Sequence, residues 1–433
     1  MTQHINVIQR FINHESFSGI LLFISALLAV IVANSAFSEY YFALWNIELG
    51  ATIAGTEASM SLMYWINDGL MALFFLMVGL EIKRELVIGE LSSVKQASFP
   101  IVAAIGGMIV PALVYVGFNT DNPMGFGVPM ATDIAFALGI LMLLGKRVST
   151  SIKVFLVALA VVDDLGAILI VATVYTKELH LEYFVHVIII YGLIWGLNYK
   201  RVTSLLPYLL LGAALWIYIH AIGIHATIAG VLLAFAIPLT SKVNEDEFIK
   251  DTKDAIDEFE KHRDDIPLLN HHQIDELENI AYNYDKVQNP LVKLEHQLHG
   301  FSAYVIMPLF AFANAGVILD FSAVSANLSI VLGVVMGLLL GKPIGIFLFT
   351  YFGSKFGIIK KPDDITWREV VAVGFVAGIG FTMSIFITAL AFLDPTTIGA
   401  VKIGIFIASF LAGVIGVVLL IQTSKAKEKA ANN

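Results

Sequence analysis

The chain has no cysteine and few charged residues. Of its 433 residues, 14% are Asp, Glu, Lys or Arg, against about 25% in soluble domains, whereas 58% are hydrophobic and the mean hydropathy is +0.82. The absence of cysteine excludes disulfides, thiolate metal sites and cysteine nucleophiles. The scarcity of charge, together with long apolar runs, predicts a polytopic membrane protein rather than a soluble globular domain.

Twelve apolar segments are long enough to cross a bilayer, which takes about 17–25 residues each. We therefore expect an all-α polytopic membrane protein with twelve transmembrane helices. The first apolar stretch, Phe17 to Ala33, exceeds the about 7–15 residues of a signal-peptide core, so it is interpreted as an uncleaved span. The segments lie near residues 16–35, 62–82, 97–117, 126–145, 153–175, 182–199, 204–219, 223–239, 299–318, 326–350, 368–391 and 399–422.

Lysine and arginine alternate along the connections between these segments. They gather after spans 2, 4, 6, 10 and 12, and Lys177 is alone after span 5. Basic residues accumulate on the cytoplasmic side of membrane proteins, so both termini are expected in the cytoplasm. The opposite connections contain no Lys or Arg and lie near 36–61, 118–125, 220–223, 319–325 and 392–398.

Acidic charge is concentrated in one hydrophilic insertion. Residues 241–298 hold fifteen Asp or Glu and seven Lys or Arg, a net −8 of the chain's −9. The expected organisation is spans 1–8 in residues 1–240, this insertion, spans 9–12 in 299–424, and a cytoplasmic tail at 425–433. Apolar spacing in the insertion predicts two amphipathic helices broken at Pro267. The insertion is either a solvated appendage or a regulatory or partner-binding element.

Four charged side chains stand inside otherwise apolar spans. Asp163 and Asp164 are adjacent in FLVALAVVDDLGAILIVATVY, Asp133 is in span 4, and Lys342 is in span 10. Each costs roughly 2.5–3.5 kcal/mol at mid-membrane on insertion scales, and residues of this kind are usually functional. The set indicates ion or proton handling, although structural ion pairs that fix helix packing are the alternative.

Glycine and proline interrupt two of the spans. Residues 125–129 crowd the start of span 4, and glycines at 374–380 precede FTMSIF in span 11. The segments Thr132–Phe136 and Thr382–Phe386 share a local pattern, and each belongs to the middle of a three-span group, 3 to 5 or 10 to 12. Paired interruptions in oppositely oriented groups predict inverted three-helix repeats with discontinuous helices at spans 4 and 11, around a midplane site.

Oxygen atoms suit a small hard cation, and the buried aspartates supply them. Asp164, Asp163 and the hydroxyl of Thr132 are the candidate ligands for Na⁺ and for protons, which would compete for the same oxygens. Neighbouring helix residues point about 100° apart, so one aspartate can face a cavity while the other faces Lys342. Asp133 is the candidate for balancing charge at a helix end.

Further ionisable residues gather at the expected cytoplasmic ends of spans 2 and 9. Histidines among carboxylates can respond to cytoplasmic pH, and an ordinary interfacial cluster is the alternative. Apart from this cluster, Asp68 lies near the external end of span 2, and His225 in GIHATIAG is interpreted as a packed histidine rather than a metal ligand. The cluster comprises Glu81, Arg84, Glu85, Glu295, His296 and His299.

A series of strings, in order along nearly the whole chain, resembles the NhaA-type sodium/proton antiporters: WINDGLMALFFLMVGLEIKREL, FPIVAAIGGMIVPALVY, ATDIAFALGIL, FLVALAVVDDLGAI, GIHATIAGV, PLFAFANAGV, GKPIGI and GIGFTMSIFI. The resemblance implies electrogenic exchange of internal Na⁺ or Li⁺ for external protons across a bacterial inner membrane. It implies no enzymatic activity, no cofactor and no nucleic-acid partner.

The resemblance also assigns roles to residues. It implies that Asp164 binds the cation, that Asp163 binds cation or pairs with Lys342, and that Thr132 and Asp133 lie in an unwound fourth span. It implies a pH response at the cluster of spans 2 and 9 and at His225. The segment 47–60 stands where the family has a dimer-forming hairpin, which makes a homodimer possible, but its residues match poorly. The insertion, roughly 243–292, is longer than the usual loop.

Three rival functions use some of the same residues. An intramembrane aspartyl protease also needs two aspartates, but it gives no reason for Lys342. A retinal-binding pump would use Lys342 as a Schiff base, but twelve spans and the lack of an aromatic cage around GKPIG argue against it. A proton-coupled exporter of another solute would need aromatic or hydrogen-bonding groups near Asp164, where the sequence is aliphatic and small. Sodium/proton exchange is therefore the preferred hypothesis.

Overall fold

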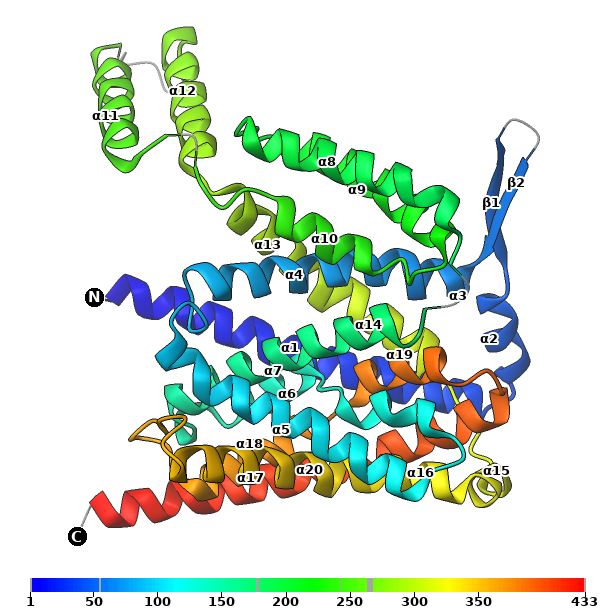
Figure 1. Ribbon diagram of the computed structural model, residues 1–433. Coiled ribbons are helices and arrows are strands. Elements are labelled where there is room, and N and C mark those ends of the chain that lie inside the picture. Colours follow the sequence, from blue (N-terminus) through cyan, green and yellow to red (C-terminus); the bar gives the residue numbers. More distant parts are fainter. Residues whose placement is uncertain (1, 54–55, 177–178, 242, 263–267, 432–433) are drawn as a thin grey trace.

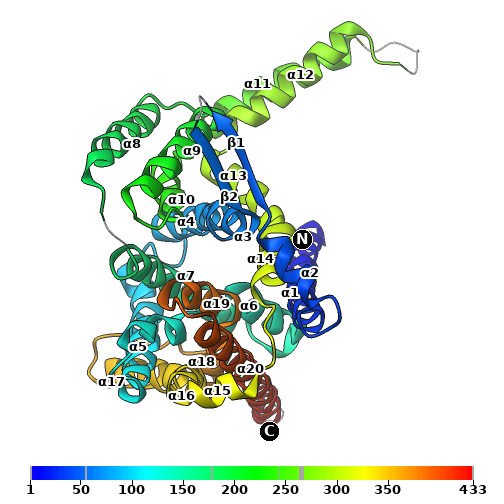
Figure 2. The same ribbon diagram turned by 90° about the vertical axis from the view of Figure 1, so that its right-hand side faces the viewer.

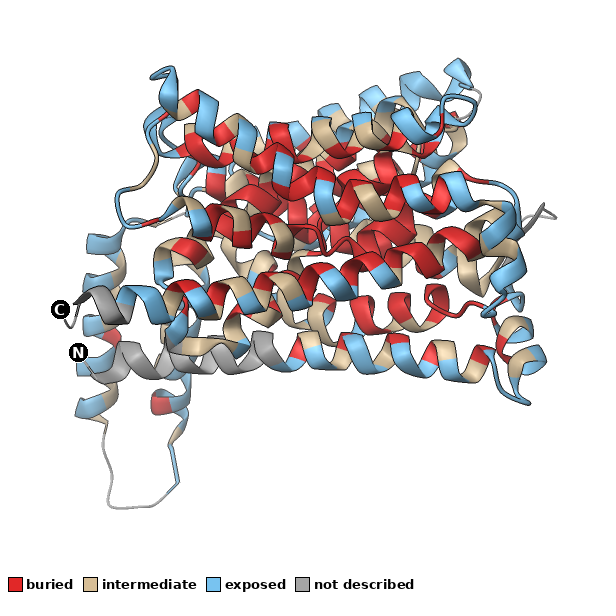
Figure 3. Ribbon diagram, turned by 90° about the horizontal axis from the view of Figure 1, so that it is seen from below, coloured by how far each residue is buried: buried red, intermediate tan, exposed pale blue. Residues whose placement is uncertain are grey.

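The computed structural model describes residues 2–53, 56–176, 179–241, 243–262 and 268–431, and most of them are helical (Figure 1). Eight helical segments are long and apolar enough to cross a membrane, or ten if each of two bent helix pairs counts as one span. The exposed residues of the long helices include many large apolar side chains, as expected for lipid contact (Figure 3). The protein is thus a multi-pass membrane protein.

The N-terminal half of the chain contributes the following elements: α1 (Thr2–Ala33), α2 (Ser38–Trp45), β1 (Glu48–Ile53), β2 (Thr56–Ser61), α3 (Leu62–Tyr64), η1 (Trp65–Leu70), α4 (Met71–Val87), α5 (Val94–Phe118), η2 (Pro123–Met130), α6 (Ile134–Leu143), η3 (Gly145–Arg147), α7 (Thr150–Thr173), η4 (Leu181–Tyr183), α8 (Phe184–Tyr199), α9 (Leu205–Ile222) and α10 (Ile228–Ala236).

The C-terminal half adds a second series: α11 (Glu245–Lys261), α12 (His271–Val287), α13 (Pro290–Phe301), η5 (Ser302–Ile306), α14 (Met307–Asn314), α15 (Phe321–Ala326), α16 (Leu328–Met336), η6 (Gly337–Gly341), α17 (Lys342–Lys355), α18 (Trp367–Ala377), α19 (Phe381–Ala391) and α20 (Pro395–Ala431). Here η1, η5 and η6 are π-helical turns, and the other η elements are 3₁₀ turns.

Ten of the twelve expected spans coincide with these ten candidates. Two expected spans have no counterpart among the candidates. The expected span near 223–239 coincides with the nine-residue α10, and the one near 299–318 coincides with the run from α13 to α14. The number twelve therefore stays a prediction.

The helices pack around two apolar cores. The larger core joins α1, α4, α5, α6, α7, α14 and the helices from α16 to α20, whereas the smaller one joins α4, α8, α9, α10 and α13. In Figure 2, viewed from the right-hand side of Figure 1, the two groups are stacked one above the other, with α4 and α7 at the boundary between them. Because α7 contacts both α4 and α5, its buried aspartates lie close to that boundary.

The expectation of an all-α protein is wrong for one short segment. Strands β1 and β2 form an antiparallel hairpin in which Glu48 pairs with Ser61 and Ile53 pairs with Thr56. The segment holds β-branched residues and is too short and polar for a span, so pairing of the two strands satisfies its backbone groups. The hairpin projects from the helical body (Figure 1).

Two helices occupy the hydrophilic insertion. Asn244 caps α11 and Asn270 caps α12 through side-chain hydrogen bonds, and the second cap is a reciprocal capping box with Gln273. The two helices pack on each other and extend away from the helical body (Figures 1 and 2). Pro267, the expected break, lies outside the described residues.

Gly106 and Gly345 allow α5 and α17 to approach at backbone distance. A Cβ atom at Gly345 would lie 2.1 Å from the carbonyl oxygen of Gly106, and one at Gly106 would lie 2.3 Å from that of Gly345. We expect Gly345→Ala to force the helices apart and to lower the free energy of unfolding by about 1–3 kcal/mol. A lower melting temperature of the purified protein checks this prediction.

The control for this substitution is Gly192→Ala on α8, because a Cβ there would meet no described atom within 4 Å. Alanine favours helices over glycine by roughly 0.5–1 kcal/mol, so the control should be as stable as the original protein or more so. Equal melting temperatures for the two variants would contradict the close packing of α5 against α17.

Candidate functional site

Helix α7 carries both adjacent aspartates into the protein interior. Asp163 is 2% exposed and Asp164 is 3% exposed, and both lie near the middle of this 24-residue helix. Asp163 Oδ2 accepts a hydrogen bond of 2.8 Å from the hydroxyl of Thr132 and forms an ion pair of 3.0 Å with Lys342 Nζ. The structure thus brings Thr132, Asp163 and Lys342 together.

Asp163 is only half satisfied by these contacts. Its second oxygen, Oδ1, is buried and has no hydrogen-bond partner among the described residues. The carboxylate of Asp164, which is 3% exposed, likewise forms no hydrogen bond or ion pair with another residue in the described part of the chain. Buried polar atoms normally find partners, so the free oxygens of this pair are available to a cation or a proton.

Helical structure is interrupted beside these aspartates in two places. Residues 131–133, between η2 and α6, are not helical, and α18 and α19 are separated by residues 378–380 and bent by 51°. The two interruptions contact each other directly. The Asp133 amide donates to the Ile379 carbonyl at 2.7 Å, and the Thr132 hydroxyl oxygen lies 3.0 Å from the Ala377 carbonyl oxygen, a second acceptor for its one proton.

Asp133 caps the first turns of two helices at this contact. Its Oδ1 accepts a hydrogen bond of 3.0 Å from the Phe136 amide of α6. Its Oδ2 accepts from the Thr382 amide at 3.1 Å and from the Thr382 hydroxyl at 2.5 Å. The N-terminus of a helix carries partial positive charge, so one carboxylate offsets two helix ends.

Lys342 supplies the complementary charge at a carbonyl end. It is the first residue of α17, directly after the π-turn η6, and it is fully buried. In addition to its ion pair with Asp163, its ammonium group donates a hydrogen bond to the carbonyl oxygen of Met130, the last residue of η2. The C-terminal end of a helix carries partial negative charge, which favours a cation at this position.

We expect Asp133→Ala to destabilise the protein, because it removes the caps of α6 and α19 together. Loss of an N-cap costs about 1 kcal/mol for each helix end. Asp133→Asn retains one carbonyl acceptor, so its melting temperature should lie between those of Asp133→Ala and the original protein. An Asp133→Ala variant with unchanged thermal unfolding would show that these hydrogen bonds do not hold the two interruptions together.

The oxygens at this site suit a small hard cation as the transported substrate. No group of three or more His, Cys, Asp or Glu side chains in the described ranges could by itself hold a metal ion. A cation between Asp163 and Asp164 would therefore need additional oxygens. The Thr132 hydroxyl, 2.8 Å from Asp163 Oδ2, is a candidate of that kind.

The cluster at the ends of spans 2 and 9 is partly assembled. Arg84 Nε lies 3.0 Å from both carboxylate oxygens of Glu295 on α13, and its guanidinium also pairs with Glu85 at 2.9 Å. Glu81 is on the same helix, α4, one turn before Glu85. His299 is half-buried on α13, whereas His296 on the same helix is exposed to solvent.

His225 and Asp68 lie together, although they are distant in sequence. His225 Nε2 is 3.4 Å from Asp68 Oδ1, and its Nδ1 is 2.8 Å from the Thr227 hydroxyl. Asp68 is in the π-turn η1, and the His225 ring packs edge-on against Phe386 at 5.3 Å. The interpretation of His225 as a packed histidine and the pH response that the resemblance implies for it both stay predictions.

Sequence reasoning missed two residues of the site. Thr382 donates two hydrogen bonds to Asp133, and Met130 accepts from Lys342 through its backbone. The shared pattern at Thr132 and Thr382 was a signal for the first residue, because both threonines stand at an interruption. A backbone carbonyl such as that of Met130 leaves no signal in the sequence.

Comparison with known proteins supports the inference from this geometry. A family model described as Na⁺/H⁺ antiporter 1 matches residues 9–420. The chain belongs to this family. It is 63% identical over 427 residues to "Na(+)/H(+) antiporter NhaA 1" of Aliarcobacter butzleri strain RM4018, with 99% of each chain covered.

Other members of the family are also similar along most of their length. The chain is 51% identical to the Na(+)/H(+) antiporter NhaA of Wolinella succinogenes, with 97% of this chain and 94% of that protein covered. It is 49% identical to the Na(+)/H(+) antiporter NhaA of Helicobacter pylori strain HPAG1, with 96% of both covered. The resemblance found in the sequence is confirmed, and membership indicates Na⁺/H⁺ antiport rather than enzymatic activity.

Proposed function

We propose that the protein is an electrogenic secondary antiporter that exports cytoplasmic Na⁺ or Li⁺ in exchange for external protons. The observation that carries this proposal is the set of free carboxylate oxygens on α7. Asp163 Oδ1 and the carboxylate of Asp164 have no hydrogen-bonding partner among the described residues. Lys342 pairs only with the other oxygen of Asp163, Oδ2. One ammonium group cannot neutralise Asp163, Asp164 and Asp133 at once. A cation or protons must supply the missing charge.

Competition between the two substrates follows from this shortage of positive charge. A sodium ion at the aspartates requires ionised oxygens, and a proton on those oxygens removes both charge and lone pairs. Loading one substrate therefore expels the other. Exposure of the site to one side of the membrane and then to the other converts this competition into exchange. In this cycle, Lys342 is released from Asp163 or stays paired with it, depending on whether Na⁺ or a proton is bound.

The interrupted helices supply the remaining oxygens and the mobility. In this proposal, spans 3–5 and 10–12 are inverted repeats, and the contact of residues 131–133 with 377–380 is the crossing point of two discontinuous helices. Asp133 and Lys342 balance the helix-end charges there. The protein is placed in a bacterial inner membrane with both termini in the cytoplasm, because the Lys- and Arg-rich connections lie on that side.

The proposed exchange is tested in everted membrane vesicles that carry a pH gradient reported by a fluorescent amine. Addition of Na⁺ or Li⁺ should dissipate the gradient, whereas K⁺ at the same concentration should not. A membrane-potential dye should respond in the same vesicles if more protons than cations move in each cycle. Absence of any response to Na⁺ and Li⁺ in vesicles that contain the folded protein would contradict the proposed function.

A proton-coupled exporter of another solute remains the alternative. It would use the same aspartates but would need a pocket with hydrogen-bonding or aromatic groups beside Asp164. The neighbours of Asp164 along α7 are Leu165, Gly166 and Ala167, which are small or aliphatic. Na⁺-dependent dissipation of the gradient in proteoliposomes that contain no other solute would exclude this alternative.

The cluster of Arg84, Glu85, Glu295 and their neighbours is proposed to set the pH response. Arg84 links α4 to α13 through Glu295, so protonation in the cluster would change the contact between these helices. We expect Glu295→Gln to displace the pH profile of Na⁺-dependent exchange while the rate at the optimum stays within about twofold, since Glu295 lies on α13 and the aspartates lie on α7. An unchanged profile would remove Glu295 from the pH response.

A homodimer is also part of the proposal. The β1–β2 hairpin is a sheet of only two strands, so each strand has an unpaired edge, and strand edges can pair with a second chain. Light scattering of the purified protein in detergent tests this association. A mass of one chain at all accessible concentrations would contradict it.

A further inference from the structure

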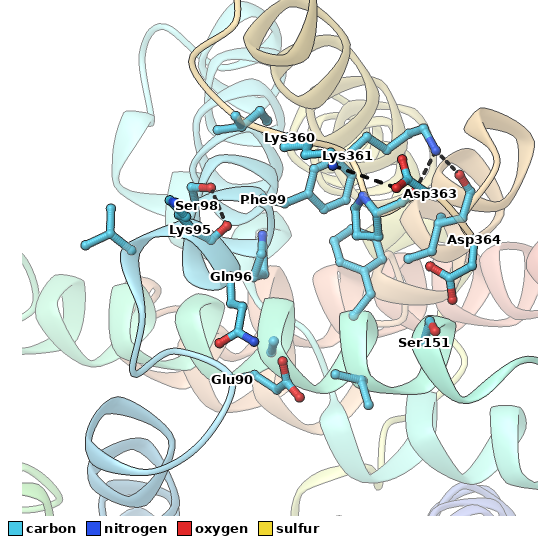
Figure 4. A pocket seen from close by; sticks show the side chains of 18 of the residues that line it. Glu90, Lys95, Gln96, Ser98, Phe99, Ser151, Lys360, Lys361, Asp363 and Asp364 are labelled. Atoms are coloured by element: carbon cyan, nitrogen blue, oxygen red, sulfur yellow. Dashed lines mark hydrogen bonds and ion pairs between the residues drawn. The ribbon is translucent and has the colours of Figure 1, made fainter.

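A large cavity opens at the end of the helical body where both chain termini lie (Figures 1 and 4). Its volume is about 1050 Å³, which suits a small amphipathic molecule. Three parts of the chain form its wall: the first turns of α5, the first turns of α7, and the connection between α17 and α18 at residues 357–365. The cavity is separate from the aspartate site, which lies deeper along α7.

The floor of this cavity is apolar. Phe99 of α5 and Phe155 of α7 are almost fully buried, and their ring centroids are 5.0 Å apart. Ala158 extends the floor along α7. At the rim, Val94 is 88% exposed and Ile358 is 72% exposed, which is unfavourable in water. Apolar side chains at both the rim and the floor favour a ligand that has hydrocarbon chains.

Charged groups of both signs surround the opening. Its lining contains three lysines and three carboxylates, namely Lys95, Lys360, Lys361, Glu90, Asp363 and Asp364. Figure 4 shows Glu90 and Gln96 on one side of Phe99, and the lysines and aspartates of the α17–α18 connection on the other.

Part of this charge is available to a ligand. Lys360 and Asp363 are 3.7 Å apart with side chains 85% and 91% exposed, and an exposed pair of this kind contributes little to stability. Lys95 forms no ion pair with another described residue. Lys361, in contrast, already donates hydrogen bonds to the Pro362 and Ile365 carbonyls. Lys95 and Lys360 are therefore the cationic groups that can meet a phosphate.

We propose that the cavity binds a phospholipid with a zwitterionic phosphoethanolamine headgroup. The phosphate lies against Lys95 and Lys360, the headgroup ammonium lies against Glu90 or Asp363, and the acyl chains begin over Phe99 and Phe155. Lysines and carboxylates in equal number match a headgroup of zero net charge better than an anionic one. A free phosphate ion would leave the apolar floor uncovered.

Such a lipid would bridge the elements that support the aspartate site. The cavity wall on α7 ends at Ala158, five residues before Asp163, and α17 of the adjoining connection begins with Lys342. A bound lipid would fix the starts of α5 and α7 relative to the α17–α18 connection. Thermal stability of the protein should therefore rise with occupancy.

Native mass spectrometry of the purified full chain tests this proposal with phosphatidylethanolamine, phosphatidylglycerol and phosphatidylcholine as probes. We expect one phosphatidylethanolamine to bind about tenfold more tightly than either other lipid and to raise the melting temperature. The Lys95→Gln/Lys360→Gln variant should bind it at least about tenfold more weakly, a difference of about 1.4 kcal/mol. Val154→Trp, which fills the cavity without changing charge, should abolish the effect.

The matched control is Lys250→Gln, which removes an exposed lysine from α11 and should leave lipid binding unchanged. If Val154→Trp does not fold, the double lysine variant still decides the question. Equal retention of phosphatidylethanolamine by the double variant and the original protein would overturn the proposal, as would tighter binding of phosphatidylglycerol. Equal stabilisation by inorganic phosphate alone would also overturn it. None of these measurements depends on ion transport.

Discussion

Replacement of Asp164 by asparagine should abolish Na⁺-dependent proton movement in everted vesicles, down to the level of vesicles without the antiporter. The asparagine side chain has nearly the same size, but it carries no charge and cannot exchange a proton. The Asp164 carboxylate is buried and forms no hydrogen bond or ion pair with the other residues that the structure describes, so this loss should not require a structural change. The measurement is dissipation of the pH gradient by Na⁺ and by Li⁺.

The control for this variant is Asp121→Asn, at an exposed aspartate in the connection before η2. It should retain full exchange, and both variants should unfold at the temperature of the original protein within the error of measurement. Retained Na⁺-dependent proton movement in a correctly folded Asp164→Asn variant would show that the cation is bound elsewhere.

The second large effect concerns the stability of the buried ion pair. Lys342→Met should lower the free energy of unfolding by about 3–5 kcal/mol, because removal of one partner leaves the other charge buried without compensation. Both side chains of the Lys342–Asp163 pair are completely inaccessible. The double variant Asp163→Asn/Lys342→Met should recover most of this loss, since it removes both charges together. Thermal unfolding in detergent measures both variants against the original protein.

Lys402→Met is the matched control for this experiment. Lys402 also lies within a long apolar helix, α20, but it has no ion pair in the described part of the chain. Its removal should be nearly neutral for stability. If Lys342→Met and Lys402→Met were equally stable, or if the double variant were no better than Lys342→Met alone, the ion pair would not be a major support of the site.

The sequence could predict those parts of the site that follow from the free-energy cost of burying a charged side chain. A charged side chain in an apolar span has a high free-energy cost, so the fold must place it next to groups that compensate its charge. This applies to Asp133, Asp163, Asp164 and Lys342. The structure does this for Asp163 with Lys342 and Thr132, and for Asp133 with two helix ends.

Contacts made by the backbone could not be predicted in the same way. Lys83 stands in the charged string EIKRE at residues 81–85. In the structure its ammonium group donates to the carbonyls of Phe235 and Ile237 at the end of α10. The Met130 carbonyl at Lys342 is a similar case. Every residue has such a carbonyl, so only the path of the chain determines which one is used.

The fold was predictable where long apolar runs set helix length, and less so elsewhere. Hydropathy does not mark the β1–β2 hairpin, because the pairing of two short polar strands depends on their register and turn. Only the resemblance to the family implied a hairpin at residues 47–60, and the residues there match it poorly. Likewise, α10 has only nine residues, so the apolar segment near 223–239 is a poor guide to the length of its helix.

The most direct test of the account is isothermal titration calorimetry of Na⁺ binding to the purified protein over a range of pH, in buffers with different ionisation enthalpies. If Na⁺ and protons compete for Asp163 and Asp164, the affinity for Na⁺ should fall as the pH is lowered, by about tenfold per pH unit for each proton displaced. Binding of Na⁺ should also release protons. An affinity for Na⁺ that stays constant across this range, with no protons released, would contradict the account.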